Sequence, residues 1–418
     1  MQKIFLVLSQ FIIALNIHAQ KKLPEYHMPA EWEPQSAVWM GWYGKPIRDS
    51  ISAQMITAIY KDEQIKMLYR DDTARFSGNR FLSKFNIDTS KIKWVKDSVT
   101  FYWMRDSGPI FLTNGSGDVR IADFGWNMFG ESFVTKKPMT ERALLIGRID
   151  RRMAEKLSLE TVPTDIVTEG GAMEVNGKGV LMAIEETAKQ RNPGKTLEEI
   201  EKEYLRVLGC TKIVWLKRAT IQDRYFDGAT AGNYFTVQGA NGHIDEMAKF
   251  VNANTIILAK IDESERNKNP ISKIDYDILE ENYEVLKKAT GANGKPFNVI
   301  RVPSPDLTQS DFISKIVIDD DARKNPDYNF SSLQNGDTAV IVSAVSYMNI
   351  FIANKAILIP AYWHEGMSLT EKRKDEEVKN LFMKLYPDRK IVQINPLPIN
   401  YHGGGGFHCA TQQEPMIK

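Results

Sequence analysis

The sequence contains little cysteine and histidine and has no excess of either charge. Two cysteines among 418 residues allow at most one disulfide bond. The 54 basic and 53 acidic residues give a formal net charge of +1, so no overall field draws the chain to nucleic acid or to an anionic membrane. Beyond the first residues, no stretch is long and apolar enough to cross a membrane. With 43% hydrophobic residues, the chain is expected to bury a large core.

The amino terminus departs from this pattern. Lys3 precedes an apolar stretch over residues 4–17, and Ala19 follows it. A basic start, a short apolar middle and a small residue are typical of a secretory signal peptide. We expect residues 1–19 to be removed and the mature chain, starting at Gln20, to be secreted or periplasmic without membrane contact. An uncleaved amino-terminal anchor is the alternative.

Strands and helices alternate along the rest of the chain. Residues 307–335 are charged and contain proline and asparagine, which favours a long exposed insertion. Thr196 and Glu199 have the spacing of a capping box at the start of a helix. The succession of strand pairs and helices, with no obvious linker, indicates one α/β architecture. Helices are expected over 50–68, 142–157, 196–208, 275–289 and 370–385, and strands over 38–42, 92–95, 118–124, 167–175, 179–184, 212–216, 255–259, 356–360 and 390–394.

Residues 403–409, which read GGGGFHC, form the most unusual stretch. Fixing four glycines costs backbone entropy, so such a run is kept where the backbone bends sharply or approaches something closely. Cys409 follows directly, with His402 and His408 beside it, and a thiol presented on a tight turn is a candidate nucleophile. The alternative is a flexible loop beside an inert buried cysteine. A disulfide with Cys210 would consume the nucleophile, so two free thiols are expected.

Five polar residues interrupt apolar surroundings elsewhere in the chain. A thiol with an imidazole would suit a cysteine protease. Three carboxylates exceed that need, and they suit a planar cation such as a guanidinium, whose N–H groups match carboxylates bidentately. A metal site is the alternative, but the chain lacks a second histidine-containing cluster, so no metal is expected. The five residues are Asp106, Glu169, His243, Asp245 and Cys409.

Five motifs give the chain a family resemblance. Their order is the one found in agmatine deiminases and bacterial-type peptidylarginine deiminases, and the similarity runs from residue 28 to residue 413. The chain therefore resembles this family of guanidine-modifying enzymes. The motifs are Trp-Met-Arg-Asp-Ser-Gly-Pro at 103–109, Glu-Gly-Gly at 169–171, Gly-His-Ile-Asp-Glu at 242–246, Ser-Tyr-Met-Asn at 346–349 and the glycine-rich cysteine turn.

The resemblance implies a fold, a reaction and roles. The fold is the pentein fold, a five-bladed α/β propeller of ββαβ units, here a single deiminase domain over residues 20–418. The reaction is hydrolysis of a guanidino group to a ureido group, with release of ammonia and a covalent thiouronium on Cys409. Asp106 and Asp245 would clamp the guanidinium. His243 would protonate the ammonia and then activate water, while Glu169 would orient His243 and contact a substrate nitrogen.

The resemblance also bears on the substrate. Asn349 and Trp126 are expected to contact it, and no metal or organic cofactor is implied. Two departures from the family affect the far end of the substrate: residues 239–241 read Gly-Ala-Asn in place of an acidic, threonine-rich segment, and Phe129 replaces a usual tryptophan. These departures do not change the expected reaction, but they leave the identity of the substrate open.

Two substrates require opposite groups in the distal pocket. Agmatine presents an amine, which calls for acidic or aromatic groups such as Asp123 or Trp126. A peptide ending in arginine presents a carboxylate, which calls for a cation such as Arg120 or Arg142. We expect agmatine, converted to N-carbamoylputrescine, and keep an arginine-containing peptide, converted to citrulline, as the alternative.

A non-catalytic guanidinium-binding protein is the hypothesis from another class, because clamping carboxylates alone could bind such a cation. A binding protein would have no need for Cys409. The expected partner is a small guanidino substrate or an arginine-containing peptide, not nucleic acid. The sequence leaves open whether the chain forms a homo-oligomer.

Overall fold

The structure, a computed structural model, describes residues 25–134, 136–224, 230–237, 239–325, 328–401 and 403–417. The expected signal peptide and His402 lie outside the described residues. Within those ranges, none of the helices combines the length and the apolar character needed to span a membrane.

Five of the six sheets in the described part of the chain repeat one pattern. A middle strand pairs antiparallel with one neighbour and parallel with the other. Helical segments connect the two parallel strands. This is the ββαβ unit that the resemblance implied. The sheets are β19-β1-β2-β3 (Gln412–Pro415, Gln35–Gly41, Gln64–Tyr69, Ile92–Lys96), β4-β5-β6 (Ile110–Thr113, Val119–Gly125, Glu160–Val167), β7-β8-β9 (Met173–Val175, Val180–Ile184, Lys212–Leu216), β11-β12-β13 (Ala248–Asn252, Thr255–Lys260, Asn298–Pro303) and β16-β17-β18 (Phe351–Ile352, Ala356–Pro360, Lys390–Ile394).

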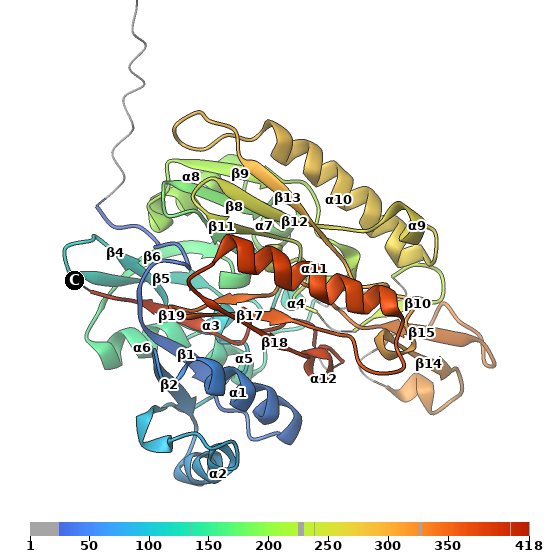
Figure 1. The fold of residues 1–418 in the computed structure, drawn as a ribbon, viewed down its shortest axis with the longest axis horizontal. Coiled ribbons are helices and arrows are strands. Elements are labelled where there is room, and N and C mark those ends of the chain that lie inside the picture. Colours follow the sequence, from blue (N-terminus) through green and yellow to red (C-terminus); the bar gives the residue numbers. More distant parts are fainter. Residues whose placement is uncertain are drawn as a thin grey trace, which may run out of the picture.

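Long helices connect each of four of these sheets to the one before it in the ring, and β4 of the second sheet contacts β19 of the first. Helix α8 (Leu197–Leu208) contacts β6 and β9, and α10 (Pro270–Lys288) contacts β9 and β12. Helix α11 (Leu369–Leu385) contacts β13 and β18, and α1 (Pro46–Ile59) from the first sheet packs on β17 and β18 of the last. The sheets therefore follow one another in a ring, and the carboxy-terminal strand β19 joins the first sheet (Figure 1).

The segment over residues 307–335, expected as a long exposed insertion, contributes a strand to a sixth sheet. Strand β14 (Ile313–Val317) pairs antiparallel with β15 (Thr338–Val342), which pairs parallel with β10 (Tyr234–Thr236). Phe312 and Phe330 are 0% and 3% exposed. Phe330 and Ile318 belong to a small separate core, whereas Phe312 packs in the main core. Much of the segment is therefore structured.

Two expected helices are wrong in their extent. The helix expected over 50–68 ends at Ile59, because the residues that follow form β2, which lies between two parallel neighbours. The helix expected over 142–157 is two helices, interrupted near Gly147, where a Cβ atom would lie 2.5 Å from the Trp126 ring. The capping box of α8 is confirmed. The remaining helices are α2 (Asp72–Ser83), α3 (Met104–Ser107), α4 (Glu131–Val134), α5 (Glu141–Ile146), α6 (Ile149–Leu157), α7 (Glu185–Arg191), α9 (Glu263–Arg266) and α12 (Leu397–Asn400), with short 3₁₀ turns that include η2 (Gly170–Ala172) and η4 (Ile244–Glu246).

Candidate active site

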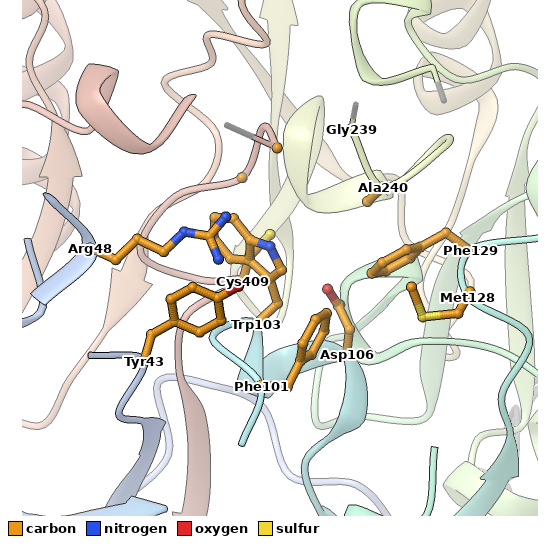
Figure 2. A pocket seen from close by; sticks show the side chains of 12 residues that line it. Tyr43, Arg48, Phe101, Trp103, Asp106, Met128, Phe129, Gly239, Ala240 and Cys409 are labelled. Atoms are coloured by element: carbon orange, nitrogen blue, oxygen red, sulfur yellow. The ribbon is translucent and has the colours of Figure 1, made fainter. Parts of the chain in front are cut away.

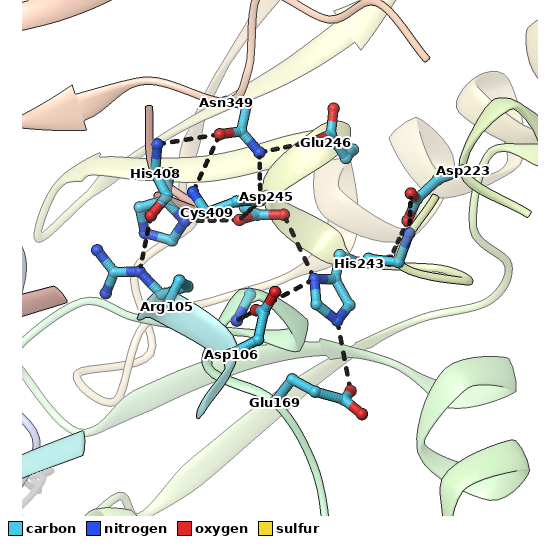
Figure 3. Close-up of polar contacts among 12 residues, drawn as sticks. Arg105, Asp106, Glu169, Asp223, His243, Asp245, Glu246, Asn349, His408 and Cys409 are labelled. Atoms are coloured by element: carbon cyan, nitrogen blue, oxygen red, sulfur yellow. Dashed lines mark hydrogen bonds and ion pairs between the residues drawn. The ribbon is translucent and has the colours of Figure 1, made fainter. Parts of the chain in front are cut away.

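The expected site residues occupy equivalent places in the fold. Each lies just before the antiparallel outer strand of one of the five sheets. Because these sheets form a ring, the turns that enter them meet at its centre, where Figure 3 shows the side chains together. The repeated fold thus supplies one site turn from each sheet. They are Asp106 before β4, Glu169 before β7, Asp245 before β11, Asn349 before β16 and Cys409 before β19.

The glycine run gives the cysteine turn its shape. Gly403, Gly404 and Gly405 have φ values of +135°, +62° and +72°, which side chains with a Cβ atom rarely adopt. A Cβ atom on Gly405 would also lie 2.9 Å from the Trp103 ring. The turn therefore needs glycine both for its backbone angles and for its close packing.

Asn349 holds the nucleophile candidate in place. The Cys409 backbone N–H donates to Asn349 Oδ1 (3.2 Å), and Asn349 Nδ2 lies 2.9 Å from Cys409 Sγ. Cys409 is 2% exposed. Burial, with the carboxylates of Asp245, Asp106 and Glu246, raises the thiol pKa well above its usual value. The thiol is therefore protonated at neutral pH when no cation compensates these carboxylates.

His243 lies among three carboxylates. Its Nε2 is 3.3 Å from Glu169 Oε2, and its Nδ1 is 3.6 Å from Asp106 Oδ1 and 4.0 Å from Asp245 Oδ1. Burial lowers the pKa of His243, but the carboxylates outweigh burial and raise this pKa to about 10. The imidazole is thus protonated at neutral pH and can act as a general acid.

The carboxyl groups of the two expected clamp residues have pKa values shifted in opposite directions. Burial raises the pKa of Asp106 to about 7, and the attraction of His243 offsets this only in part. Burial also raises the pKa of Asp245, but a hydrogen bond from His408 reverses the effect and leaves this pKa below its usual value. Asp245 Oδ2 accepts from His408 Nδ1 (2.6 Å) and from the Cys409 thiol (3.3 Å). Asp245 Oδ1 has no hydrogen-bond partner among the described residues.

Gly171 explains the second glycine of the Glu-Gly-Gly motif. A Cβ atom at this position would lie 2.4 Å from His243 Nδ1 and 3.0 Å from both Asp106 Oδ1 and Asp245 Oδ2. Any larger residue would therefore push apart the three groups that surround the reacting centre.

A cavity of about 270 Å³ leads to Cys409 and Asp106 (Figure 2). Among the described residues that line it, Asp106 is the only acid and Arg48 the only cation. The Arg48 guanidinium carbon lies 4.5 Å from the centre of the Tyr43 ring. His243, Asp245 and Glu169 are at most 1% exposed and lie behind the cavity lining. The other lining residues are Tyr43, Phe101, Trp103, Met128, Phe129, Gly239, Ala240, Gly403 and Gly405.

Trp126, expected to contact substrate, lies one layer away. It packs edge-on against Phe101 and Phe129, with ring centroids 6.0 Å and 5.1 Å apart. These two rings line the cavity and Trp126 does not. Phe129 therefore presents its ring to the cavity, and Trp126 supports it from behind.

The charged residues considered for the distal pocket have partners elsewhere. Asp123 pairs with Arg151 at 2.7 Å, and Arg120 pairs with Glu160 at 3.0 Å. Arg142 donates to a backbone carbonyl at 3.1 Å. None of the three lines the cavity. The cavity cation, Arg48, was missed because nothing in its local sequence connects it to the other motifs.

Two further buried residues position the His243 turn. Asp223 accepts backbone N–H groups from Ala240, Gly242 and His243 at 2.7, 2.9 and 2.8 Å. Arg191 pairs with Glu169 at 3.0 Å, and both side chains are fully buried. Neither residue lies in one of the recognised motifs, so sequence reasoning did not identify them.

The acidic centre has the donors of a cation site. The ligand atoms of Asp106, His243 and Cys409 lie within 4.8 Å of one another, as do those of Asp245, Glu246 and Cys409. A substrate guanidinium would satisfy the same charge through its N–H groups. The expectation that no metal is required stays a prediction.

A thiol, a protonated imidazole and several carboxylates at the centre of a ring of ββαβ sheets define a guanidine-modifying enzyme of the pentein fold. The family described as Porphyromonas-type peptidyl-arginine deiminase matches residues 27–415. The chain belongs to this family, and the family resemblance noted in the sequence is confirmed.

Individual relatives agree with this assignment. The chain is 30% identical to an agmatine deiminase of Medicago truncatula over 410 residues, which cover 94% of the chain and 97% of the relative. Its structure resembles the agmatine deiminase of Enterococcus faecalis, with a TM-score of 0.72, 23% identity and coverage of 95% and 99% of the two chains. The agmatine deiminase of C. jejuni gives a TM-score of 0.64 at 18% identity, covering 94% and 96%. The expected pentein fold is confirmed.

Proposed function

We propose that the chain is a hydrolase that converts a guanidino group to a ureido group and releases ammonia. The observation that carries this proposal is that the Cys409 thiol and the Asp106 carboxylate line one cavity, with the protonated His243 and the Asp245 carboxylate directly behind them. A guanidinium always carries charge and resists attack by a neutral thiol. The site supplies both the charge compensation and the proton donor that this reaction needs.

In the first half of the reaction, the substrate guanidinium donates N–H groups to Asp106 and to Oδ1 of Asp245. Its positive charge compensates the carboxylates that raise the thiol pKa, so Cys409 can lose its proton to water in the cavity. The thiolate attacks the central carbon and forms a tetrahedral adduct. His243 donates its proton to the departing nitrogen, ammonia leaves and a thiouronium remains on Cys409.

In the second half, the neutral His243 accepts a proton from water, and the resulting hydroxide attacks the thiouronium carbon. The C–S bond breaks, the hydroxyl proton passes to the sulfur of Cys409, which becomes a thiol again, and the ureido product leaves. Glu169 accepts from Nε2 of His243, which keeps Nδ1 directed toward the clamp carboxylates. Its burial and its pairing with Arg191 support a role in orienting His243 rather than in contacting substrate.

We propose agmatine as the substrate and N-carbamoylputrescine as the product. The agmatine deiminases among the relatives support this choice. The cavity supports it as well, because aromatic rings line the path to Cys409 and suit a slender aliphatic chain.

A second candidate is an arginine at the end of a peptide, which would become citrulline. Arg48 favours it, because a guanidinium at the cavity wall can pair with a substrate carboxylate. Three aromatic rings, those of Tyr43, Tyr102 and Trp103, lie 4.5, 5.2 and 5.6 Å from its guanidinium carbon. The positive charge would repel the amine of agmatine.

The ratio of kcat/KM for agmatine to that for a peptide ending in arginine separates the two substrates. A ratio well above one supports agmatine, and a ratio well below one transfers the proposal to the peptide. If Arg48 binds the carboxylate of the substrate, Arg48→Gln should lower kcat/KM for the peptide at least tenfold. The same change should leave kcat/KM for agmatine unchanged or raise it. Arg120→Gln is the matched control, since Arg120 pairs with Glu160 away from the cavity. No ammonia release from any guanidino compound by folded protein would refute the proposed reaction.

We also propose that residues 1–19 direct export and are then removed. The basic start, the apolar stretch and Ala19 support this. Amino-terminal sequencing of the protein from its native host would find Gln20 first, whereas an intact Met1 would favour the anchor.

The expectation that the reaction needs no metal has its own test. Activity that survives exhaustive chelation would support a reaction without a metal.

A further inference from the structure

A second charged cluster lies behind Cys409, and the proposed reaction does not use it. His408, the residue before the nucleophile, has a side chain that is 3% exposed. Its Nδ1 lies 2.6 Å from Asp245 Oδ2, as Figure 3 shows, and its Nε2 lies 3.1 Å from Glu31 Oε2. Lys249 Nζ lies 2.6 Å from the same Glu31 oxygen. A buried row of alternating charges thus runs away from the reacting centre.

The geometry defines the protonation state of His408. Glu31 and Asp245 each have another cation beside them: Lys249 Nζ is 2.6 Å from Glu31 Oε2, and the protonated His243 is 4.0 Å from Asp245 Oδ1. These cations favour the ionised form of both carboxyl groups. An ionised carboxylate accepts hydrogen bonds and donates none. Each ring nitrogen of His408 must therefore donate, and only the imidazolium carries two N–H groups.

A metal ion between these residues is the alternative explanation. The ligand atoms of Glu31, Glu174 and His408 lie within 4.8 Å of one another. The Lys249 ammonium, however, is 2.6 Å from Glu31 and 2.7 Å from Glu174. An ammonium already supplies the positive charge that these two carboxylates require, so the cluster is complete without a metal.

We propose that His408 is a positioning residue for the reaction: as an imidazolium it binds Oδ2 of Asp245, keeps this carboxylate ionised and leaves Oδ1 for the substrate. Because a carboxylate is planar, fixing one oxygen fixes the direction of the other. Oδ1 lies 4.0 Å from His243 Nδ1 and has no hydrogen-bond partner among the described residues. The inference rests on the proposed function, since it assigns Asp245 to substrate binding.

The surroundings of Asp245 make this role necessary. Acidic groups outnumber basic ones around it, and a buried carboxylate near other carboxylates tends to take up a proton. Without His408, Asp245 would share protons with its neighbours and would no longer bind a cation near neutral pH. The titratable and charged groups that face Asp245 or His408 are Glu31, Arg105, Asp106, Glu169, Glu174, His243, Glu246, Lys249 and Cys409.

Two variants of His408 with similar shape separate the effect of its hydrogen bond to Asp245 from the effect of its positive charge. His408→Asn keeps an N–H donor near the position of Nδ1, facing Asp245, while His408→Gln keeps one near Nε2, facing Glu31. A hydrogen bond to a charged group contributes about 1.5–3 kcal/mol, or roughly 10- to 100-fold. We expect KM to rise about tenfold in His408→Asn and about 100-fold in His408→Gln, with smaller changes in kcat.

The pH profile reports the charge. The acid limb of kcat/KM falls below about pH 7 through Asp106 in the wild type. In both variants this limb should become steeper, because the carboxylate of Asp245 loses its nearest cation, takes up a proton more readily and titrates together with Asp106. A residue that only fills space would not change this limb. Equal KM values for both variants and an unchanged acid limb in folded protein would overturn the proposal.

A readout without turnover tests the same inference. In ¹⁵N-histidine-labelled protein at pH 7.5, both ring nitrogens of His408 should carry a proton, assigned by their absence in His408→Asn. If the His408 ring carries only one proton, the proposed imidazolium is wrong, whether or not the enzyme acts on a guanidino compound. If the doubly protonated ring is found but no guanidino compound reacts, the proposed function fails and the charge assignment stands.

Discussion

Cys210 and Cys409 are both free, buried thiols, yet their surroundings differ completely. Cys210 is 7% exposed and belongs to an apolar cluster with Val207 and Leu208 at the end of α8. Burial alone raises its pKa to about 12. Cys409 is 2% exposed, but its neighbours include the carboxylates of Asp245 and Asp106, and it borders the cavity.

The comparison shows that burial makes both thiols unreactive and that only one can be activated. At Cys210, no described group near the sulfur would change its charge on binding a ligand. At Cys409, carboxylates contribute to the high pKa, and a bound cation compensates them. The substrate therefore helps to create its own nucleophile, and the thiol stays protected from other chemistry before the substrate binds.

The largest effect is expected for Cys409→Ala. This change removes the nucleophile, and turnover should fall at least about 10⁴-fold, as for other covalent catalysts. Asp106 and Asp245 remain, so calorimetry should still detect substrate binding. Substantial turnover by the variant would show that another group attacks the guanidinium.

Gly171→Ala should come next, with a loss of activity of about 100-fold or more, because misplacement of reacting groups by about 1 Å has this cost. The added methyl group would meet Asp106, His243 and Asp245 together. Gly194→Ala is the control: Gly194 has φ +90° and open space around it, so this change should cost stability but not activity. Melting temperature and kcat/KM, measured on both variants, separate strain from displacement.

The pH dependence follows from Asp106. Its pKa is raised to about 7 in the folded protein, so kcat/KM should fall as the pH drops below about 7. The protonated form is favoured by folding, so the stability that it contributes is present at low pH and is lost as the pH rises toward 7. Asp106→Asn should lose turnover but melt several degrees higher than the wild type at pH 8, and the difference should shrink toward pH 5. A melting temperature of Asp106→Asn below that of the wild type at pH 8 would contradict the predicted direction of the effect.

The smallest effect is expected for Cys210→Ala. Activity should stay within about twofold, because the thiol lies in the core against α8. Loss of a buried sulfur should reduce the free energy of unfolding by about 1 kcal/mol, measured by urea denaturation. A loss of activity in Cys210→Ala as large as that in Cys409→Ala would show that Cys210 is not merely a core residue.

The sequence predicted what depends on local patterns. The capping box of Thr196 and Glu199 was confirmed, because both partners lie within one helical turn. The motifs around Asp106, Glu169, His243 and Asp245 were recognisable from their common order along the chain, and the repeated ββαβ unit brings them together at the turns that enter the sheets.

What the sequence could not predict depends on contacts between distant segments. The apolar spacing over 50–68 predicted one helix across the polar residues 61–64, whereas Gln64–Tyr69 pairs with two parallel strands that are each separated from it in the sequence by a helix. Apart from Tyr43, the other residues that line the cavity lie far along the chain from Arg48. His408 was noticed only as a neighbour of Cys409, whereas its partner Glu31 lies near the start of the described chain.

Mass spectrometry of enzyme quenched during turnover tests the central claim most directly. With a guanidino substrate, the account predicts that the peptide containing Cys409 gains the mass of the substrate less ammonia, while the peptide containing Cys210 stays unmodified. The adduct should be absent in Cys409→Ala. Turnover with no adduct on Cys409, or with the adduct on Cys210, would contradict the account.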